Sequence, residues 1–311
     1  MRRSLSRSLT AASIACVLAA VGAGCGGDDG PDADPKTVLG EVAAKKIDSA
    51  EVRLSTTADI PGFPILGSKI AIEGHGPFVA NGPDALPEFD WNVVMRAGGQ
   101  TFPARVSGID GKVYVEFMGQ FYEADPEQLE QLGLEDGAGK PRPTSLAEFG
   151  INPDDWVTRV EVSDGDDIGG DATQVVTGVV NKQAVLEDLL ELAPADTLSG
   201  LLGDVEGAPE ASDENVEKAA KAIDSAKVEV NVDGDGYPRR VYAKLRFTVP
   251  KDIKDTAITS GTVVFDLTLE QIGDVTVNVE APFDPDPLSD LFDFARSIFG
   301  IESVSDLWQK P

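Results

Sequence analysis

Histidine is the scarcest reactive side chain in this chain of 311 residues, with His75 as its single instance. Hydrolytic triads, histidine acid–base catalysis and histidine-rich metal sites would all depend on that one imidazole. Glycines flank it on both sides, and this predicts a turn residue. No glycine loop with lysine, of the kind that holds phosphates, is present either. We therefore expect no enzyme, no catalytic residue and no cofactor.

Basic charge is also scarce, because 26 lysine and arginine residues face 54 acidic residues, for a formal net charge of −28. The basic residues form no concentrated stripe. This argues against nucleic acid as a partner and against direct adhesion to anionic lipid headgroups. An acidic excess of this kind is typical of a solvated surface.

The acidic run from Asp164 to Asp171 raises the question of a calcium site. Counting an EF-hand loop from Asp164 puts Ile168 at the fifth place and Val175 at the twelfth, where oxygen ligands belong. The run therefore predicts an acidic hairpin turn, and we expect no metal site.

Long apolar runs are absent except near the amino terminus. There, Leu9–Val21 follows three arginines and is too short to span a bilayer, which needs about 20 residues. A basic region followed by a short apolar region is typical of an export signal, so residues 1–24 are interpreted as a signal peptide.

Cysteine is nearly absent, and its position is informative. Cys25 follows the small residues Gly22-Ala-Gly24 in the order of a bacterial lipobox, with glycine at the place where leucine is usual. Removing residues 1–24 also removes Cys16, so Cys25 becomes the one thiol and no intramolecular disulfide can form. We predict that Cys25 is the lipid-attachment residue and anchors the protein on the extracytoplasmic face of the cell membrane.

The residues after Cys25 predict a flexible acidic tether. Residues 25–34 carry no apolar side chain larger than alanine after the cysteine, so the segment cannot bury enough surface to order itself. Asp34-Pro35 then predicts the start of a helix with Val38, Leu39 and Val42 on one face. Cleavage removes three arginines and no acidic residue, so the net charge of the mature chain moves from −28 to −31.

The carboxy-terminal part predicts an antiparallel meander. Apolar residues alternate with polar ones, which indicates strands with one buried face, and the connections are too short for parallel crossovers. The predicted strands are Ala226–Asp233, Arg240–Val249, Thr259–Leu269 and Val275–Ala281, followed by a helix over Leu288–Phe299.

Two stretches of this meander resemble the LppX/LprG family of actinobacterial lipoproteins, including LprA-type proteins. They are Val228–Val241, with Asp-Gly-Asp-Gly at its centre, and Phe265–Pro282. Weaker similarity covers Ile109–Asp125 and Asp164–Val180. The resemblance implies a LolA-like fold, binding and carriage of an acylated lipid or glycolipid, and a lipid exporter as a further partner.

The first part of the chain predicts strands too, with Gly98-Gly99 and Asp110-Gly111 as two-residue hairpin turns. Asn181 predicts the cap of a helix that contains Val185. The predicted strands are Ala50–Asp59, Lys69–Val79, Glu88–Ala97, Thr101–Ile109, Lys112–Phe117, Phe121–Ala124, Trp156–Val162 and Ala172–Val180.

The segments Ala44–Leu54 and Ala220–Val230 match at seven of eleven positions. The match favours an internal duplication over chance similarity of two helix-to-strand junctions. We therefore expect residues 35–311 to form a single domain made of two similar halves, 35–192 and 213–309.

Together these patterns predict an α+β fold with one strongly curved, mainly antiparallel sheet, a half-barrel with short helices on its concave apolar face. The predicted function is lipid carriage by a membrane-anchored lipoprotein, and the alternative is a tethered scaffold or sensor that binds protein without stable lipid. The residues expected to line a lipid cavity are Val230, Leu245, Phe247, Phe265, Leu267 and Val277.

Overall fold

The computed structural model describes residues 35–61, 68–82, 85–125, 144–148, 150–192, 220–249 and 259–291. By its internal contacts the chain divides into two units, residues 1–34 and 35–311, and the description below concerns the second. Cys25 and the predicted signal peptide and tether lie outside the described residues.

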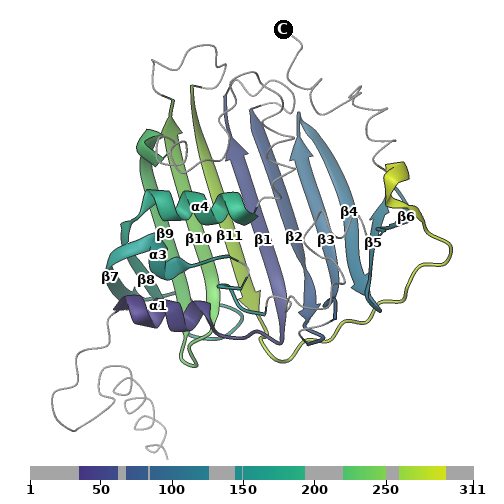
Figure 1. Ribbon diagram of the computed structural model, residues 1–311, viewed down its shortest axis with the longest axis horizontal. Coiled ribbons are helices and arrows are strands. Elements are labelled where there is room, and N and C mark those ends of the chain that lie inside the picture. Colours follow the sequence, from purple (N-terminus) through teal and green to yellow (C-terminus); the bar gives the residue numbers. More distant parts are fainter. Residues whose placement is uncertain are drawn as a thin grey trace, which may run out of the picture. The chain divides into compact units, whose positions relative to one another are not determined.

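One twelve-stranded sheet dominates the fold (Figure 1). Its strand order is β12-β6-β5-β4-β3-β2-β1-β11-β10-β9-β8-β7, so β12 and β7 form two free edges and the sheet does not close. The strands are β1 Ser49–Asp59, β2 Lys69–Val79, β3 Glu88–Ala97, β4 Gln100–Ile109, β5 Lys112–Phe117, β6 Gln120–Glu123, β7 Val157–Asp164, β8 Thr173–Val180, β9 Ile223–Asp233, β10 Pro238–Thr248, β11 Ser260–Glu270 and β12 Asp286–Pro287.

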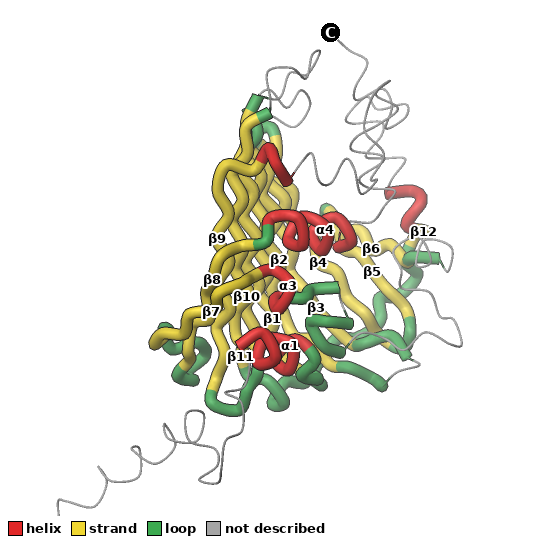
Figure 2. Tube along the Cα trace, turned by 60° about the vertical axis from the view of Figure 1, so that its left-hand side comes forward, coloured by secondary structure: helices red, strands yellow, loops and turns green. Residues whose placement is uncertain are grey.

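Every strand pair is antiparallel except the short pair of β12 with β6. Figure 2 shows the sheet curling around the helices. The predicted fold class, a strongly curved and mainly antiparallel sheet with short helices on one face, is confirmed.

Three described helices lie on the concave face over the β7–β11 side of the sheet (Figure 1). They are α1 Pro35–Ala43, α3 Pro153–Trp156 and α4 Lys182–Leu192. The predicted cap of α4 is confirmed, because Asn181 Oδ1 accepts a long hydrogen bond (3.5 Å) from the backbone N–H of Ala184. Helical structure also begins at Leu288 as predicted, and the part of that helix beyond residue 291 lies outside the described residues.

The two hairpin turns of the first half fix the register of three neighbouring strands. Gly98 and Gly99 have φ of 58° and 76°, and Asp110 and Gly111 have φ of 51° and 78°. These positive values match the right-handed twist of the flanking strands, as the sequence predicts. Residue pairing across β3, β4 and β5 follows directly from the two turns.

The predicted strand Val275–Ala281 is wrong. This segment pairs with no strand, although Val275, Val277 and Val279 are still partly buried and the residues between them are exposed. The physical reason is that β1 and β10 already occupy both edges of β11. The chain leaves the sheet instead, with Gly273 N–H donating to the Ser49 carbonyl (2.9 Å), and rejoins it at β12.

His75 is not a turn residue, which corrects a second prediction. It lies within β2, opposite Arg53 of β1 and Asn92 of β3, and is exposed. The neighbouring Gly76 has φ of 154°, and a Cβ atom there would lie 2.0 Å from the carbonyl oxygen of Asp90. Glycine is needed for a close approach between strands here, not for a turn.

Trp156 is a third correction, because it ends α3 instead of starting a strand, and β7 begins at Val157. The proline at position 153 starts this short helix, and Trp156 is fully buried. The matching segments Ala44–Leu54 and Ala220–Val230 enter β1 and β9 respectively. The duplication itself stays a prediction.

Candidate functional site

The convex face of the sheet is charged and solvated. Neighbouring strands carry cross-strand ion pairs, of which Arg240–Asp266 and Arg105–Asp90 are bidentate with N···O distances of 2.6–2.7 Å. The hydrogen bonds that Arg240 donates to the Asp266 carboxylate raise the pKa of Arg240. These groups stabilise one another's charged forms, so they suit a wet surface and not proton transfer.

The concave face is apolar, and its β8–β11 side packs against the helices. We call this side the covered part. Its cluster joins Leu39 and Val42 of α1, Trp156 of α3 and Val185 of α4 to the inward side chains of the strands. The strand members include Val176, Val228, Val230, Val241, Ala243, Leu245 and Phe265.

Five of the six residues predicted to line a lipid cavity lie in or against the covered part. Val230, Leu245 and Phe265 belong to its buried cluster, and Phe247 and Leu267 pack on it while remaining partly exposed. Val277 is partly buried in the segment that follows β11. The structure therefore brings five together, and their contact with a ligand stays a prediction.

Over β1–β5 the concave face is covered by none of the three described helices (Figure 1). We call this side the uncovered part. Ile72 of β2 has 41% of its surface exposed. The other inward side chains are partly exposed too, namely Leu54, Ile70, Val93, Met95, Phe102, Ala104, Val106, Val115 and Phe117.

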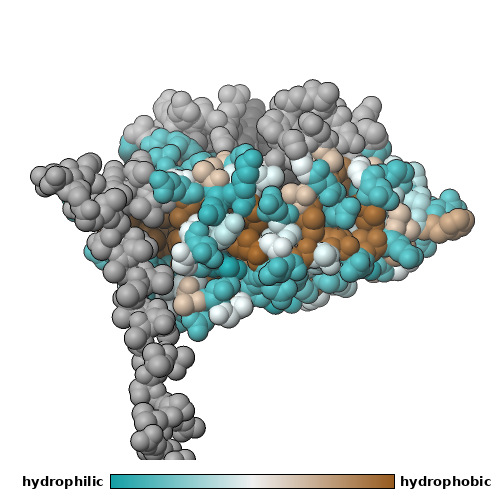
Figure 3. All heavy atoms as spheres, turned by 90° about the horizontal axis from the view of Figure 1, so that it is seen from below, coloured by the Kyte–Doolittle hydropathy of each residue, from teal (hydrophilic) through white to brown (hydrophobic). Residues whose placement is uncertain are grey.

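Polar groups are nearly absent from the uncovered part. Trp91 Nε1 is satisfied within the sheet, because it donates to the carbonyl of Pro77 (3.1 Å). Thr56 supplies one hydroxyl. Seen from below, the molecule has apolar residues gathered in a band between polar margins (Figure 3). A surface with so few donors and acceptors favours contact with groups that have no hydrogen-bond donors or acceptors themselves.

The far edge of the uncovered part is closed by a small second cluster. Leu86, Val113 and Leu288 are buried there with Tyr122 and Ala124, and Phe89, Val106, Val115, Phe117 and Leu291 pack against them. The uncovered part is thus bounded by the helices on one side and by this cluster on the other.

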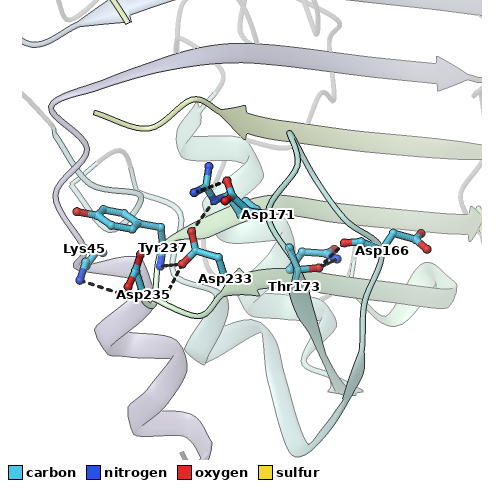
Figure 4. Close-up of polar contacts among 9 residues, drawn as sticks. Lys45, Asp166, Asp171, Thr173, Asp233, Asp235 and Tyr237 are labelled. Atoms are coloured by element: carbon cyan, nitrogen blue, oxygen red, sulfur yellow. Dashed lines mark hydrogen bonds and ion pairs between the residues drawn. The ribbon is translucent and has the colours of Figure 1, made fainter. Parts of the chain in front are cut away.

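A buried polar corner ties the β7–β8 hairpin to the β9–β10 hairpin (Figure 4). Asp233 accepts from the backbone N–H groups of Asp235 and Tyr237 (2.9 Å each) and pairs with Arg239, which also reaches Asp171 (2.9 Å). The run Asp164–Asp171 forms the predicted acidic hairpin turn, and Thr173 Oγ1 donates to the Asp166 carbonyl. Within the described part of the chain, no three acidic, histidine or cysteine side chains form a group suited to a metal ion.

The sequence reasoning did not single out Ile72, Met95 and Phe102. The signal for them was present, because the Gly98-Gly99 turn pairs Met95 with Phe102, and alternation along β2 places Ile72 on the same face. What the pattern does not contain is which strands the helices cover.

No protein-family model matches the chain, and no curated protein matches it. Among solved structures, the crystal structure of LprF from Mycobacterium bovis is similar, with 13% sequence identity and a TM-score of 0.36. The match covers 82% of this chain and 99% of that one. No helix among the described residues is both long and apolar enough to cross a bilayer.

Proposed function

We propose that this protein binds an acylated lipid or glycolipid on its concave face and carries it outside the cytoplasm, tethered to the membrane through acylated Cys25. The observation that supports this best is the uncovered part of the concave face. Ile72 and its neighbours are partly exposed large apolar side chains, contiguous across five strands, while the opposite face of the same strands is charged.

The energetics favour hydrocarbon as the occupant. Covering apolar surface releases about 25 cal/mol for each Å² removed from water. Large exposed apolar patches on soluble domains commonly mark binding sites. A peptide would leave backbone N–H and C=O groups without partners on this surface, whereas an acyl chain has no such groups to satisfy.

The cell-envelope location follows from the amino-terminal pattern and belongs to the same proposal. A lipid exporter in the membrane would be the natural donor or acceptor of the cargo. The scaffold or sensor alternative uses the same apolar face for a protein partner and needs no bound lipid.

Extraction of the purified protein tests lipid carriage. The full chain with Cys25→Ser, which has no acylation site, is produced in an actinobacterial host and examined by native mass spectrometry, and its organic extract is then analysed. We expect a bound species with acyl-chain fragments. Protein that yields no acyl-chain mass but retains a stoichiometric protein partner would overturn the carrier function in favour of the scaffold.

A further inference from the structure

The uncovered part contains a row of small side chains that crosses the strands. The register pairs Leu54 of β1 with Gly74 of β2, Gly74 with Val93 of β3, and Val93 with Ala104 of β4. Ala104 in turn pairs with Phe117 of β5. The row therefore has bulky side chains at its two ends and two small residues, Gly74 and Ala104, on either side of Val93.

Larger side chains border this row on both sides. On one side the register aligns Ile72, Met95 and Phe102, and on the other it aligns Trp91, Val106 and Val115. Because the inward side chains of a strand repeat every two residues, these rows flank the small row directly. We call the middle row the furrow, with Gly74, Val93 and Ala104 as its floor and the two bordering rows as its walls.

Gly74 differs from the other glycines on the inward side of the central strands. A Cβ atom at Gly108 or Gly261 would meet the rings of Phe89 or Phe247 at 2.4–2.6 Å, and one at Gly76 would meet the Asp90 carbonyl. Among the described residues, a Cβ atom at Gly74 would meet only Val93 Cγ2, at 3.8 Å. Neighbouring atoms thus occupy the place of a side chain at the first three glycines, whereas at Gly74 no described atom comes closer than 3.8 Å to that place.

The length of the furrow fits one hydrocarbon chain. Its two ends, Leu54 of β1 and Phe117 of β5, are four strand spacings of about 4.8 Å apart, or roughly 19 Å, and its floor from Gly74 to Ala104 spans two of these spacings, or roughly 10 Å. One leaflet of a bilayer, which holds acyl chains end on, is about 15 Å thick. The floor and the walls contain no charged side chain, and the Trp91 N–H is already occupied.

We propose that one acyl chain of the ligand lies across the strands in this furrow, and that Gly74 and Ala104 set the length of chain that fits. This inference rests on the proposed function and adds a position and a specificity to it. Filling the floor should shorten the chain that the protein accepts.

The test uses the full chain with Cys25→Ser, delipidated, and saturated fatty acids of 8 to 20 carbons in competition with a fluorescent 16-carbon fatty acid. We expect Ala104→Leu to lower the affinity for hexadecanoic acid roughly ten-fold or more, because the poor fit of even one methylene group costs about 1–3 kcal/mol of binding free energy. The optimum should shift toward shorter acids. Gly74→Val, whose Cβ atom would meet no described atom closer than 3.8 Å, should act in the same direction.

Ala71→Leu is the matched control. Ala71 lies on β2 opposite Arg96, on the charged face, and the substitution adds the same atoms there. It should leave the length profile unchanged. A hexadecanoic acid with a terminal diazirine provides a second measurement that needs no substitution, and it should label peptides that contain β2–β4.

The outcomes separate the two proposals. Three outcomes would overturn the furrow and leave lipid carriage standing. The Cys25→Ser protein without floor substitutions could bind host lipid but not hexadecanoic acid, or the floor variants could keep its chain-length profile. The diazirine could also label only β9–β11. If neither host lipid nor any fatty acid binds, lipid carriage falls and the furrow with it.

Discussion

Arg239 occupies the extra position of a β-bulge, because Pro238 pairs with Val232 while Arg240 already pairs with Asn231. The bulge places Arg239 and Arg240 in different surroundings. The Arg239 side chain is 8% exposed and joins Asp233 and Asp171, whereas Arg240 is 33% exposed and pairs with Asp266 on the charged face. We therefore expect the two adjacent arginines to contribute differently to stability.

Arg239→Met should lower the free energy of unfolding by about 3 kcal/mol, since it leaves the buried Asp233 carboxylate without its cation. Arg240→Met, the matched control, should cost about 1 kcal/mol or less, because its pair is more exposed. Urea denaturation measures both. Adding Asp233→Asn to Arg239→Met should recover part of the loss, since an amide oxygen can still accept from Asp235 and Tyr237. Equal losses for the two arginine variants would contradict this reading of the corner.

Asp188 links two of the helices that cover the concave face. From α4 it accepts hydrogen bonds from the Asn152 N–H (2.8 Å), from Asn152 Nδ2 (3.3 Å) and from Trp156 Nε1 of α3 (2.7 Å). Burial raises the pKa of Asp188 despite these bonds, and nearby Asp155 adds to the effect. Folding therefore favours the protonated form of Asp188 over its ionised form.

The pH dependence of α4 docking follows from the direction of that pKa. A folded-state pKa above the ordinary value gives stability that is present at low pH and lost as pH rises through the folded pKa. Lowering the pH from 7 toward 4 should therefore raise the thermal midpoint of the wild type relative to Asp188→Asn. Glu187→Gln on the exposed side of α4 controls for the charge change. If the difference in thermal midpoint between wild type and Asp188→Asn stays constant with pH, burial does not raise the pKa of the Asp188 carboxyl.

Among the elements, those with local signals were predictable and those set by neighbours were not. The strands of the first half were predicted nearly to the residue, because alternation and the Gly98-Gly99 and Asp110-Gly111 turns are local features. The failure at Val275–Ala281 is different. Its alternation is real, but pairing needs a free edge, and β11 has none because its partners β1 and β10 come from distant parts of the chain.

The same distinction holds for the candidate site. Alternation identifies which side chains face inward, and so the six predicted lining residues were chosen from the strands with the cleanest pattern. Where helices dock is a tertiary property, and they dock on those strands. The partly exposed residues lie instead on β1–β5, whose position beside β11 is set by pairing between the two halves of the chain.

At the scale of the whole chain, the acidic net charge bears on how the protein could be held at a membrane. The chain expected after cleavage has a net charge of −31, and its sequence contains no concentrated basic stripe to hold it on anionic lipids, so the proposed membrane attachment would depend on acyl chains. One chain binds a bilayer only marginally, and the two or three chains of a lipoprotein make attachment persistent. The ten residue steps from Cys25 to Pro35 could extend at most about 36 Å, which sets the largest distance between Pro35 and the proposed anchor.

Cys25→Ala should therefore abolish incorporation of a fatty acid in metabolic labelling and move the protein from the membrane fraction to a soluble or secreted one. Cys16→Ala, which changes the other cysteine, should label normally because that residue leaves with the signal peptide. Both variants are compared with wild type by fluorography and fractionation in the same host. Label on Cys25→Ala equal to that on wild type would place the anchor elsewhere, and the distance limit set by the tether would no longer apply.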